Sequence, residues 1–325
     1  MEMRLLIIGR GAVAVMLAAR FSYAGFKVVV ADKYGTDKTI ELCTYSSFDS
    51  KRIRGKVYFS AMKNLDIQSF DLIILCTKLF QLKNILTFLN KNCGKEINKV
   101  YVQNGFVEEI VEMSNNDHIA ILNMACRLID PKTSYSSIFK SIHFPSDTSP
   151  VVLNAFKKTN FEIISHGDYL YSRLRKFVLA CTSAWMAIHN LSIEESFYNK
   201  PLNVGLYRAI DETASILSQY ALSVDEISVS CQLLRLANNI SNEISIGKNI
   251  KTKLLSYTSL FQDLERRNGI TEIEFLNGKI CSMARELGVE AKCNNFLYRA
   301  IKFAQKNKLT PLELEKKLHK IIMEG

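Results

Sequence analysis

The sequence has no run of about 18 consecutive apolar residues, the length that a helix needs to cross a bilayer. Its 8 cysteines contain no C-x-x-C pair, and its 5 histidines are scattered. These absences exclude the usual zinc-site spacings, so no metal site is expected. Dispersed cysteines inside apolar runs are typical of reduced core residues.

The chain also lacks a block of basic residues, although its formal net charge is +10 at pH 7. Lysine and arginine are spread along the sequence, and no aromatic RNA-binding motif accompanies them. We therefore expect a solvated basic surface that attracts anionic ligands, and no nucleic-acid partner. The first strand pattern begins near residue 4, which leaves no room for a signal peptide. A cytoplasmic protein without a membrane partner is expected.

With 325 residues, 48% of them hydrophobic and 23% charged, the sequence is typical of a globular protein of two domains. Short apolar and β-branched runs at 4–8, 27–32, 70–76 and 98–102 alternate with helical patterns such as 78–92. This alternation predicts an α/β domain, a Rossmann-type parallel sheet with helices on both faces.

The pattern changes after residue 118, where short strands at 119–122, 135–144 and 161–164 predict an antiparallel extension of the sheet. From residue 168 onward the sequence is helical, which predicts an all-α C-terminal domain. The expected domains are 1–167 and 168–325. Helices are predicted at 168–191, 202–222, 224–244, 272–287, 294–305 and 311–323, with a polar loop over 247–270.

The first strand runs directly into a glycine-rich turn that opens an apolar helix. Gly9 permits a tight turn, Gly11 lets the backbone approach a pyrophosphate, and Ala14 allows close packing of helix and strand. Asp32 ends the second strand, 21 positions after Gly11, where a ribose-binding carboxylate is expected. The pattern predicts dinucleotide binding, with a simple strand-to-helix turn as the alternative.

Polar residues follow the next two strands at their carboxyl ends. Thr77 and Lys78 follow the strand at 70–76, and Asn104 with Gly105 follows the strand at 98–102. Ligands of parallel sheets bind at this edge, so we expect both strand ends to face one crevice. Asn-Gly is equally typical of a simple turn.

Taken together, these residues resemble the ketopantoate reductase (2-dehydropantoate 2-reductase) family. The resemblance runs through nearly the whole chain, and its most specific part is the pair of segments Ser259–Leu264 and Thr271–Gly278, followed by Glu286–Val289. It implies a two-domain reductase with its active site in the cleft between the domains. A 2-keto acid would be reduced there with NADPH.

The resemblance also implies roles for individual residues. Lys176 would be the proton donor, Glu272 would hold the substrate hydroxyl, and Ser259 would contact the substrate carboxylate, with Asn104 beside substrate and cofactor. Hydride delivery leaves negative charge on the keto oxygen, which a cation both stabilises and protonates. A surface lysine and a helix-start carboxylate are the structural alternatives for Lys176 and Glu272. The implied cofactor-binding residues are Gly9, Arg10, Gly11, Ala12, Val13, Asp32, Lys33, Thr77, Lys78, Asn104 and Glu272.

The sequence departs from the family one and two turns after the lysine. Asparagines are usual there, but this chain has Ala180 and Ala184 on the same helix face as Lys176. Either Thr182, Ser183 or Asn199 supplies the missing hydrogen bonds, or the substrate is not ketopantoate.

Adjacent residues at the end of the second strand favour different cofactors. Asp32 favours NAD by accepting from a 2′-hydroxyl, whereas Lys33, at the family's basic position, favours the 2′-phosphate of NADP. Arg10 is within reach of the same phosphate, so two cations oppose one carboxylate, and NADPH is the expected cofactor.

The predicted function is therefore NADPH-dependent reduction of 2-dehydropantoate to pantoate in pantothenate biosynthesis. A reductase of the same family with another 2-keto acid is one alternative, and a non-catalytic nicotinamide-nucleotide sensor is another. A homodimer is compatible with the sequence, which leaves the oligomeric state open.

Overall fold

The structure is a computed structural model that divides into two compact units, Met1–Tyr169 and Leu170–Gly325. The described residues are 3–32, 37–46, 49, 51–92, 97–137, 141–165, 167, 169–198, 200–223, 226–236, 257–266 and 270–324.

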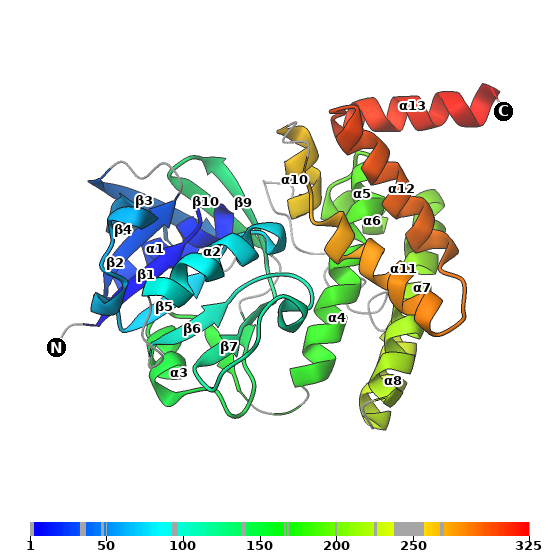
Figure 1. Cartoon of the computed structure of the whole chain (residues 1–325). Coiled ribbons are helices and arrows are strands. Elements are labelled where there is room, and N and C mark those ends of the chain that lie inside the picture. Colours follow the sequence, from blue (N-terminus) through cyan, green and yellow to red (C-terminus); the bar gives the residue numbers. More distant parts are fainter. Residues whose placement is uncertain are drawn as a thin grey trace. The chain divides into compact units, whose positions relative to one another are not determined.

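The first unit is organised by a large, mostly parallel sheet (Figure 1). Its strands are β1 (Arg4–Ile8), β2 (Lys27–Asp32), β3 (Lys38–Ser46), β4 (Ile53–Ala61), β5 (Leu72–Leu75), β6 (Asn98–Tyr101), β7 (Asp117–Ile119), β9 (Ala125–Asp130) and β10 (Thr133–Ser137). Their order is β7-β6-β5-β1-β2-β4-β3-β10-β9. The chain fills one side of β1 with β2 and β4 and then crosses to β5 on the other side, so the topological switch point lies between β1 and β5.

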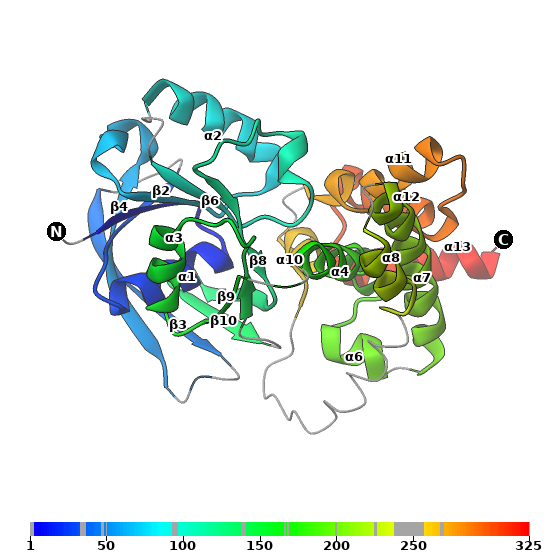
Figure 2. The same ribbon diagram turned by 90° about the horizontal axis from the view of Figure 1, so that it is seen from below.

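Helices cover both faces of this sheet (Figure 2). The helix α1 (Ala12–Tyr23) and α3 (Pro150–Lys157) lie on one side and α2 (Leu79–Asn92) on the other. Short 3₁₀ turns lie at Met62–Asn64, Ile67–Ser69 and Val107–Glu109. The strands β1 and β5 read as continuous apolar runs because both of their faces are buried, as is typical of parallel strands.

The Rossmann-type α/β unit followed by a helical unit is confirmed, but the predicted antiparallel extension is only partly right. The strand β10 joins β3 in parallel, and only β9 pairs with it antiparallel. The strands β8 (Ile121–Leu122), β11 (Ser141–His143) and β12 (Glu162–Ile164) form a separate three-stranded sheet instead. Short polar-interrupted strands carry too little pattern to define their partners, so pairing is decided by tertiary packing.

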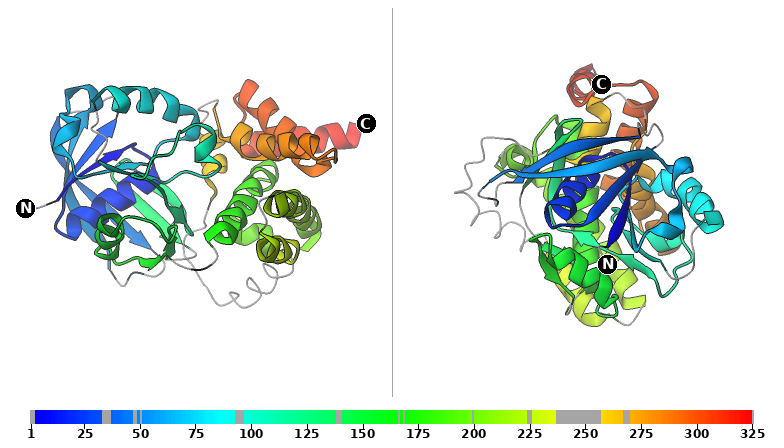
Figure 3. Two further views of the ribbon diagram at one scale, coloured as in Figure 1. Left: turned by 60° about the horizontal axis from the view of Figure 1, so that its bottom comes forward. Right: turned by 90° about the vertical axis from the view of Figure 1, so that its left-hand side faces the viewer.

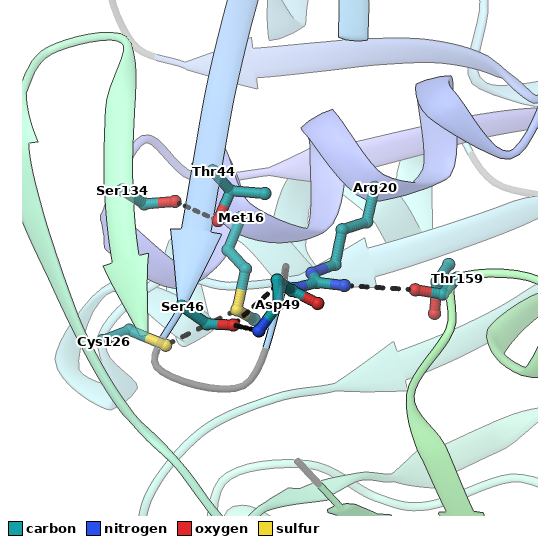
Figure 4. A network of polar contacts seen from close by, with 8 residues as sticks. All are labelled: Met16, Arg20, Thr44, Ser46, Asp49, Cys126, Ser134 and Thr159. Atoms are coloured by element: carbon teal, nitrogen blue, oxygen red, sulfur yellow. Dashed lines mark hydrogen bonds and ion pairs between the residues drawn. The ribbon is translucent and has the colours of Figure 1, made fainter. Parts of the chain in front are cut away.

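A buried arginine ties α1 to the rest of the first unit (Figure 4). Arg20 is 1% exposed and pairs with Asp49, which also accepts a hydrogen bond of 2.7 Å from the Ser46 hydroxyl. Its Nη1 donates to the Thr159 carbonyl oxygen at 3.5 Å, and the guanidinium lies 4.6 Å from the centre of the Phe161 ring. These contacts fix the helix whose amino end carries the glycine turn, because a buried charge is stable only when it is paired.

The second unit is helical. Its helices are α4 (Tyr169–Cys181), α5 (Ser183–Ile188), α6 (Ile193–Tyr198), α7 (Lys200–Ser223), α8 (Ile227–Leu234), α10 (Ser259–Glu265), α11 (Asn277–Glu286), α12 (Lys292–Lys306) and α13 (Pro311–Glu324), with a 3₁₀ turn η5 at Ile273–Phe275. The left panel of Figure 3 looks nearly along α7 and α8, which pack side by side. None of the described helices combines the length and the apolar character that a bilayer span requires.

Two helical predictions are corrected by the structure. The single helix expected over 168–191 is broken at Thr182, where the hydroxyls of Thr182 and Ser183 donate to the carbonyl oxygens of Leu179 and Ala180 and compete with the helical amides. The helix expected over 272–287 is split at Leu276, whose φ of −110° and ψ of −98° are not helical.

The polar loop expected over 247–270 contains α10. Thr258 caps this helix by accepting a hydrogen bond from the Phe261 N–H, and Leu260 and Leu264 are buried. Residues 237–256 of the predicted 224–244 helix and of this loop lie outside the described residues.

Candidate functional site

The glycine turn lies at the switch point, as its strand-turn-helix pattern predicts. Gly9 has a φ of +129°, a region that side chains avoid, and a Cβ there would lie 2.9 Å from the Cys76 carbonyl oxygen. Its N–H donates to the Ala31 carbonyl oxygen at 3.0 Å. The turn is therefore pressed between the carboxyl ends of β2 and β5, and only glycine fits at position 9.

Gly11 is different, because the space around it is open. A Cβ on Gly11 would meet nothing within 4 Å, and the residue is the N-cap of α1 in an ordinary extended conformation. The helical hydrogen bonds of α1 begin at Val15, whose N–H donates to the Gly11 carbonyl oxygen at 3.0 Å. The preceding N–H groups, of Ala12 to Ala14, lie at the positive end of the helix, which is a ready-made phosphate site.

The residues that follow β5 lie next to the glycine turn. Thr77 places its Cγ2 at 3.3 Å from the position of a Gly9 Cβ, and the Lys78 N–H donates to Gln81 Oε1 at 3.2 Å. Burial, followed by the nearby Cys126, raises the pKa of the Cys76 thiol far above its ordinary value. Cys76 is thus a neutral thiol, and the cysteines among the described residues are all free.

Asn104 lies in the turn after β6, followed by Gly105 with a φ of +105°. The residue before it, Gln103, is not among the predicted site residues and is 8% exposed at the strand end. Its Nε2 donates to the Leu75 carbonyl oxygen at 2.9 Å, which attaches the end of β6 to the end of β5. Its position directly before a predicted site residue is the sequence signal for it.

On the other side of the turn the structure describes only part of the predicted adenosine site. Asp32 ends β2, paired with Ala61 of β4, while Lys33 lies outside the described residues. The guanidinium of the exposed Arg10 lies 5.6 Å from the centre of the Phe59 ring on β4. Arg10 is thus held on the β2–β4 side of the turn.

In the helical unit, Lys176 is half-buried on α4 beside buried Phe177 and Val178. Ala180 lies one turn further on the same face, and Ala184 is fully buried in α5. The proposed substitutes for the missing amides, Thr182 and Ser183, donate their hydroxyl protons to backbone oxygens of their own helix turn. Asn199 lies outside the described residues.

Ser259 is the first residue of α10, and Thr258 performs the capping at this helix start. The hydroxyl of Ser259 is therefore not needed for the cap, which leaves it suited to a ligand. Leu260 and Ile273, the neighbours of Ser259 and Glu272, belong to one apolar cluster with Ala184. The structure thus brings these predicted residues into one region of the helical unit.

Glu272 and Glu274 lie two residues apart and have opposite environments. Glu272 is 5% exposed and makes no capping hydrogen bond, whereas Thr271 Oγ1 accepts from the Ile273 N–H at 3.2 Å. Glu274 is exposed and bonds Lys302 Nζ at 2.5 Å, an ion pair that lowers the pKa of Glu274 against the effect of its partial burial. Glutamates are rarely fully buried, so the buried Glu272 is the functional candidate of the two.

A buried amide fixes the Glu272 segment to the end of α4. Asn277, fully buried, donates through Nδ2 to the Cys181 carbonyl oxygen at 3.2 Å and to Asn294 Oδ1 at 2.9 Å. Asn294 in turn donates to Glu212 Oε1 at 2.9 Å. These bonds connect α11, α12 and α7 to the carboxyl end of the helix that carries Lys176.

The first unit fits a dinucleotide on its own geometry. The open space at Gly11 and the unpaired N–H groups of α1 suit a pyrophosphate, and the buried Thr77 Oγ1 and Gln103 Oε1 have no hydrogen-bond partner among the described residues. No group of three or more metal-ligating side chains occurs within the described ranges.

Comparison with known proteins agrees with this geometry. One family model, ketopantoate reductase PanE/ApbA, matches residues 5–125, and a second, ketopantoate reductase PanE/ApbA C terminal, matches residues 168–305. The chain belongs to the ketopantoate reductase family. Members of this family are oxidoreductases, and the two matches correspond to the sheet unit and the helical unit. No curated protein sequence matches the chain.

Solved structures share the fold at low sequence identity. D-mandelate dehydrogenase with NADH and anilino(oxo)acetate has a TM-score of 0.74 and 19% identity, over 94% of this chain and 99% of that chain. Dimeric ketopantoate reductase from Staphylococcus aureus has a TM-score of 0.69 and 14% identity, over 94% and 100%. A PanE/ApbA family ketopantoate reductase from Ralstonia eutropha JMP134 has a TM-score of 0.70 and 17% identity, over 94% and 99%.

Proposed function

We propose that this protein is an NADPH-dependent 2-keto acid reductase, with the conversion of 2-dehydropantoate to pantoate, a step of pantothenate biosynthesis, as its reaction. Residues 1–167 would bind the dinucleotide and residues 168–325 the keto acid. The observation that carries the proposal is the glycine turn at the switch point, open at Gly11, in a chain of the ketopantoate reductase family. The dimeric relative from Staphylococcus aureus supports a homodimer as the assembly.

The chemistry assigns a proton transfer to the helical unit. A nicotinamide held by the first unit would supply a hydride to the keto carbon, which would shift the electron pair of the C=O double bond to the oxygen. Lys176 then gives one Nζ proton to that oxygen, which completes the hydroxyl, and the neutral amine regains a proton from solvent. A cation at this position stabilises the developing negative charge, which is commonly the largest single contribution to such catalysis.

Ser259 and Glu272 are proposed to orient the substrate. The hydroxyl of Ser259 is suited to donate to a carboxylate oxygen, and the buried carboxylate of Glu272 is suited to accept from a substrate hydroxyl. A hydrogen bond to a charged acceptor is stronger than a neutral one, so Glu272 would discriminate hydroxylated keto acids from those without the hydroxyl.

Replacing Glu272 with alanine is expected to lower kcat/KM for ketopantoate far more than for 2-oxoisovalerate, which lacks the hydroxyl, because only the hydroxylated substrate loses a partner. A difference of about tenfold or more between the two losses is expected. Steady-state assays of both substrates measure it. Glu274→Ala is the matched control, since Glu274 is exposed and bonds Lys302 and Tyr298. Equal losses for both keto acids would make Glu272 a structural residue.

The wild-type protein is expected to oxidise NADPH with ketopantoate and to prefer NADPH over NADH by roughly tenfold or more in kcat/KM. We base this preference on Arg10 and Lys33, two cations that would attract the 2′-phosphate, against the single carboxylate of Asp32, which would repel it. A panel of 2-keto acids, each assayed with both cofactors, tests substrate and cofactor together. A clear preference for NADH would place the Asp32 carboxylate at the ribose. If none of the 2-keto acids in the panel is reduced, the proposed reaction is refuted.

A second candidate function is reduction of a different 2-keto acid, one with an apolar substituent. Ala180 and Ala184 offer no hydrogen bond, and the hydroxyls of Thr182 and Ser183 donate to the backbone. The structural likeness to D-mandelate dehydrogenase supports this candidate as well. The same panel decides between the two, because the preferred keto acid would then lack the hydroxyl.

A further inference from the structure

Two buried polar atoms at the carboxyl ends of β5 and β6 have no hydrogen-bond partner among the described residues. They are Oγ1 of Thr77, after β5, and Oε1 of Gln103, after β6. Buried polar groups in native proteins are almost always paired, so each unpaired one needs an explanation. Both residues follow neighbouring parallel strands at the carboxyl edge of the sheet, where ligands of such sheets bind.

The orientation of the Gln103 amide is fixed by its other half. Nε2 donates to the Leu75 carbonyl oxygen at 2.9 Å. A carbonyl oxygen only accepts, so turning the amide over would set two oxygens against each other. Oε1 is therefore the free half of the amide, an acceptor with no donor in the described part of the chain.

The residues that carry the two unpaired atoms follow adjacent strands. Leu75 of β5 is in register with Tyr101 of β6, and the Val102 N–H continues the ladder by donating to Leu75 at 3.0 Å. Thr77 and Gln103 each come two residues after this pair, so they occupy equivalent positions on adjacent strand ends. Thr77 also adjoins Gly9, since its Cγ2 lies 3.3 Å from the position of a Gly9 Cβ.

The strand order decides which half of a dinucleotide reaches them. The pyrophosphate site follows β1, and Asp32, the ribose candidate, follows β2 on one side of it. The strands β5 and β6 lie on the other side of β1, where the second half of the cofactor would extend. Gln103 offers an acceptor and Thr77 a hydroxyl that donates or accepts, which suits the carboxamide and the ribose hydroxyls found in that half.

We propose that Thr77 and Gln103 together bind the nicotinamide riboside half of the cofactor through Oγ1 and Oε1. This inference rests on the proposed dinucleotide binding. It assigns a function to Gln103, and it specifies which half of the cofactor Thr77 contacts. Both residues position the cofactor and take no part in proton transfer.

The test is calorimetric titration of Thr77→Val and Gln103→Met with NADPH, with 2′-phospho-ADP-ribose and with adenosine 2′,5′-bisphosphate. Each variant is expected to lose about five- to tenfold in affinity for NADPH, the usual effect of one lost hydrogen bond. Affinity for adenosine 2′,5′-bisphosphate, which lacks the riboside half, should stay within about twofold. A loss for 2′-phospho-ADP-ribose identifies the ribose hydroxyls as the partner, and no loss identifies the carboxamide.

Stability of the ligand-free protein separates this role from a structural one. Because the Thr77 hydroxyl bonds no described residue, Thr77→Val should keep its melting temperature within about 2 °C, and Thr77→Ser should keep the affinity for NADPH. Gln103→Met also loses the bond to Leu75, so Thr77→Val is the decisive variant if Gln103→Met folds poorly. Gln68→Met, at an exposed glutamine that bonds the Asn92 carbonyl, is the matched control.

Equal losses for adenosine 2′,5′-bisphosphate, or unchanged affinity for NADPH in Thr77→Val, would overturn the inference while dinucleotide binding by the wild-type protein stands. Wild-type protein that binds NADPH but reduces no 2-keto acid would refute the proposed reaction and leave this inference intact. Absence of any dinucleotide binding by the wild-type protein would refute both.

Discussion

Replacing Lys176 with alanine is expected to lower kcat by about a hundredfold or more, the usual effect of removing a positioned acid. The lysine is half-buried on α4 and is the proposed proton donor to the keto oxygen. The loss should appear in kcat and kcat/KM alike, because the interaction is made chiefly in the transition state. The affinity for NADPH should change little. Stopped-flow and steady-state assays with the preferred keto acid measure these quantities.

The matched control for this change is Arg175→Ala. Arg175 is the neighbouring cation on the same helix and is also half-buried, but its side chain leaves the helix about 100° away from that of Lys176. This variant should retain turnover within a few-fold of the wild-type value. Wild-type turnover in Lys176→Ala would move the proton donor elsewhere and leave Lys176 a surface residue of an amphipathic helix.

Replacing Gly11 with valine is expected to abolish dinucleotide binding and leave the fold intact. Gly11 has a φ of −78° and a ψ of 178°, an extended conformation that β-branched residues adopt without strain. Apart from its chain neighbours, the new Cβ would meet no atom of the described residues within 4 Å, so the side chain would fill the space that the pyrophosphate needs. Calorimetric titration with NADPH and a thermal melt measure the two effects.

Gly9→Ala is the contrasting variant in the same turn. With a φ of +129° and a Cβ 2.9 Å from the Cys76 carbonyl oxygen, alanine at position 9 is strained and overpacked. This variant should be destabilised by about 1–3 kcal/mol. Unchanged NADPH affinity in Gly11→Val would show that the turn does not hold the pyrophosphate, whereas a large drop in its melting temperature would show that position 11 is structural.

The sequence by itself determined the parts of the fold that rest on local pattern. The apolar runs at β1 and β2 and the glycines after β1 define a strand, a turn and a helix within some twenty residues, because both strand faces are buried and the turn needs glycine. The helices α12 and α13 follow from the apolar period and from Pro311 at the first helical position. The resemblance to the ketopantoate reductase family named Lys176, Ser259 and Glu272 as candidates.

Other elements depended on competing hydrogen bonds and on packing partners, which a local sequence pattern does not show. The break after Cys181 arises where two consecutive hydroxyls bond the helix backbone, and α10 forms inside a polar segment because Thr258 caps it and its apolar residues find a core. The strands β8, β11 and β12 pair with one another and not with the main sheet. Short strands acquire their partners from packing, so their sequence alone leaves several pairings open.

Within the candidate site, the sequence named residue types and the tertiary structure decided their environments. Gly9 is required because β5, about 65 residues later in the chain, places the Cys76 carbonyl against it. Glu272 and Glu274 are alike in sequence, and only packing buries the first and pairs the second with Lys302. The unpaired oxygen of Gln103 could not be predicted from the sequence, because it exists only once the neighbouring strand has fixed the amide.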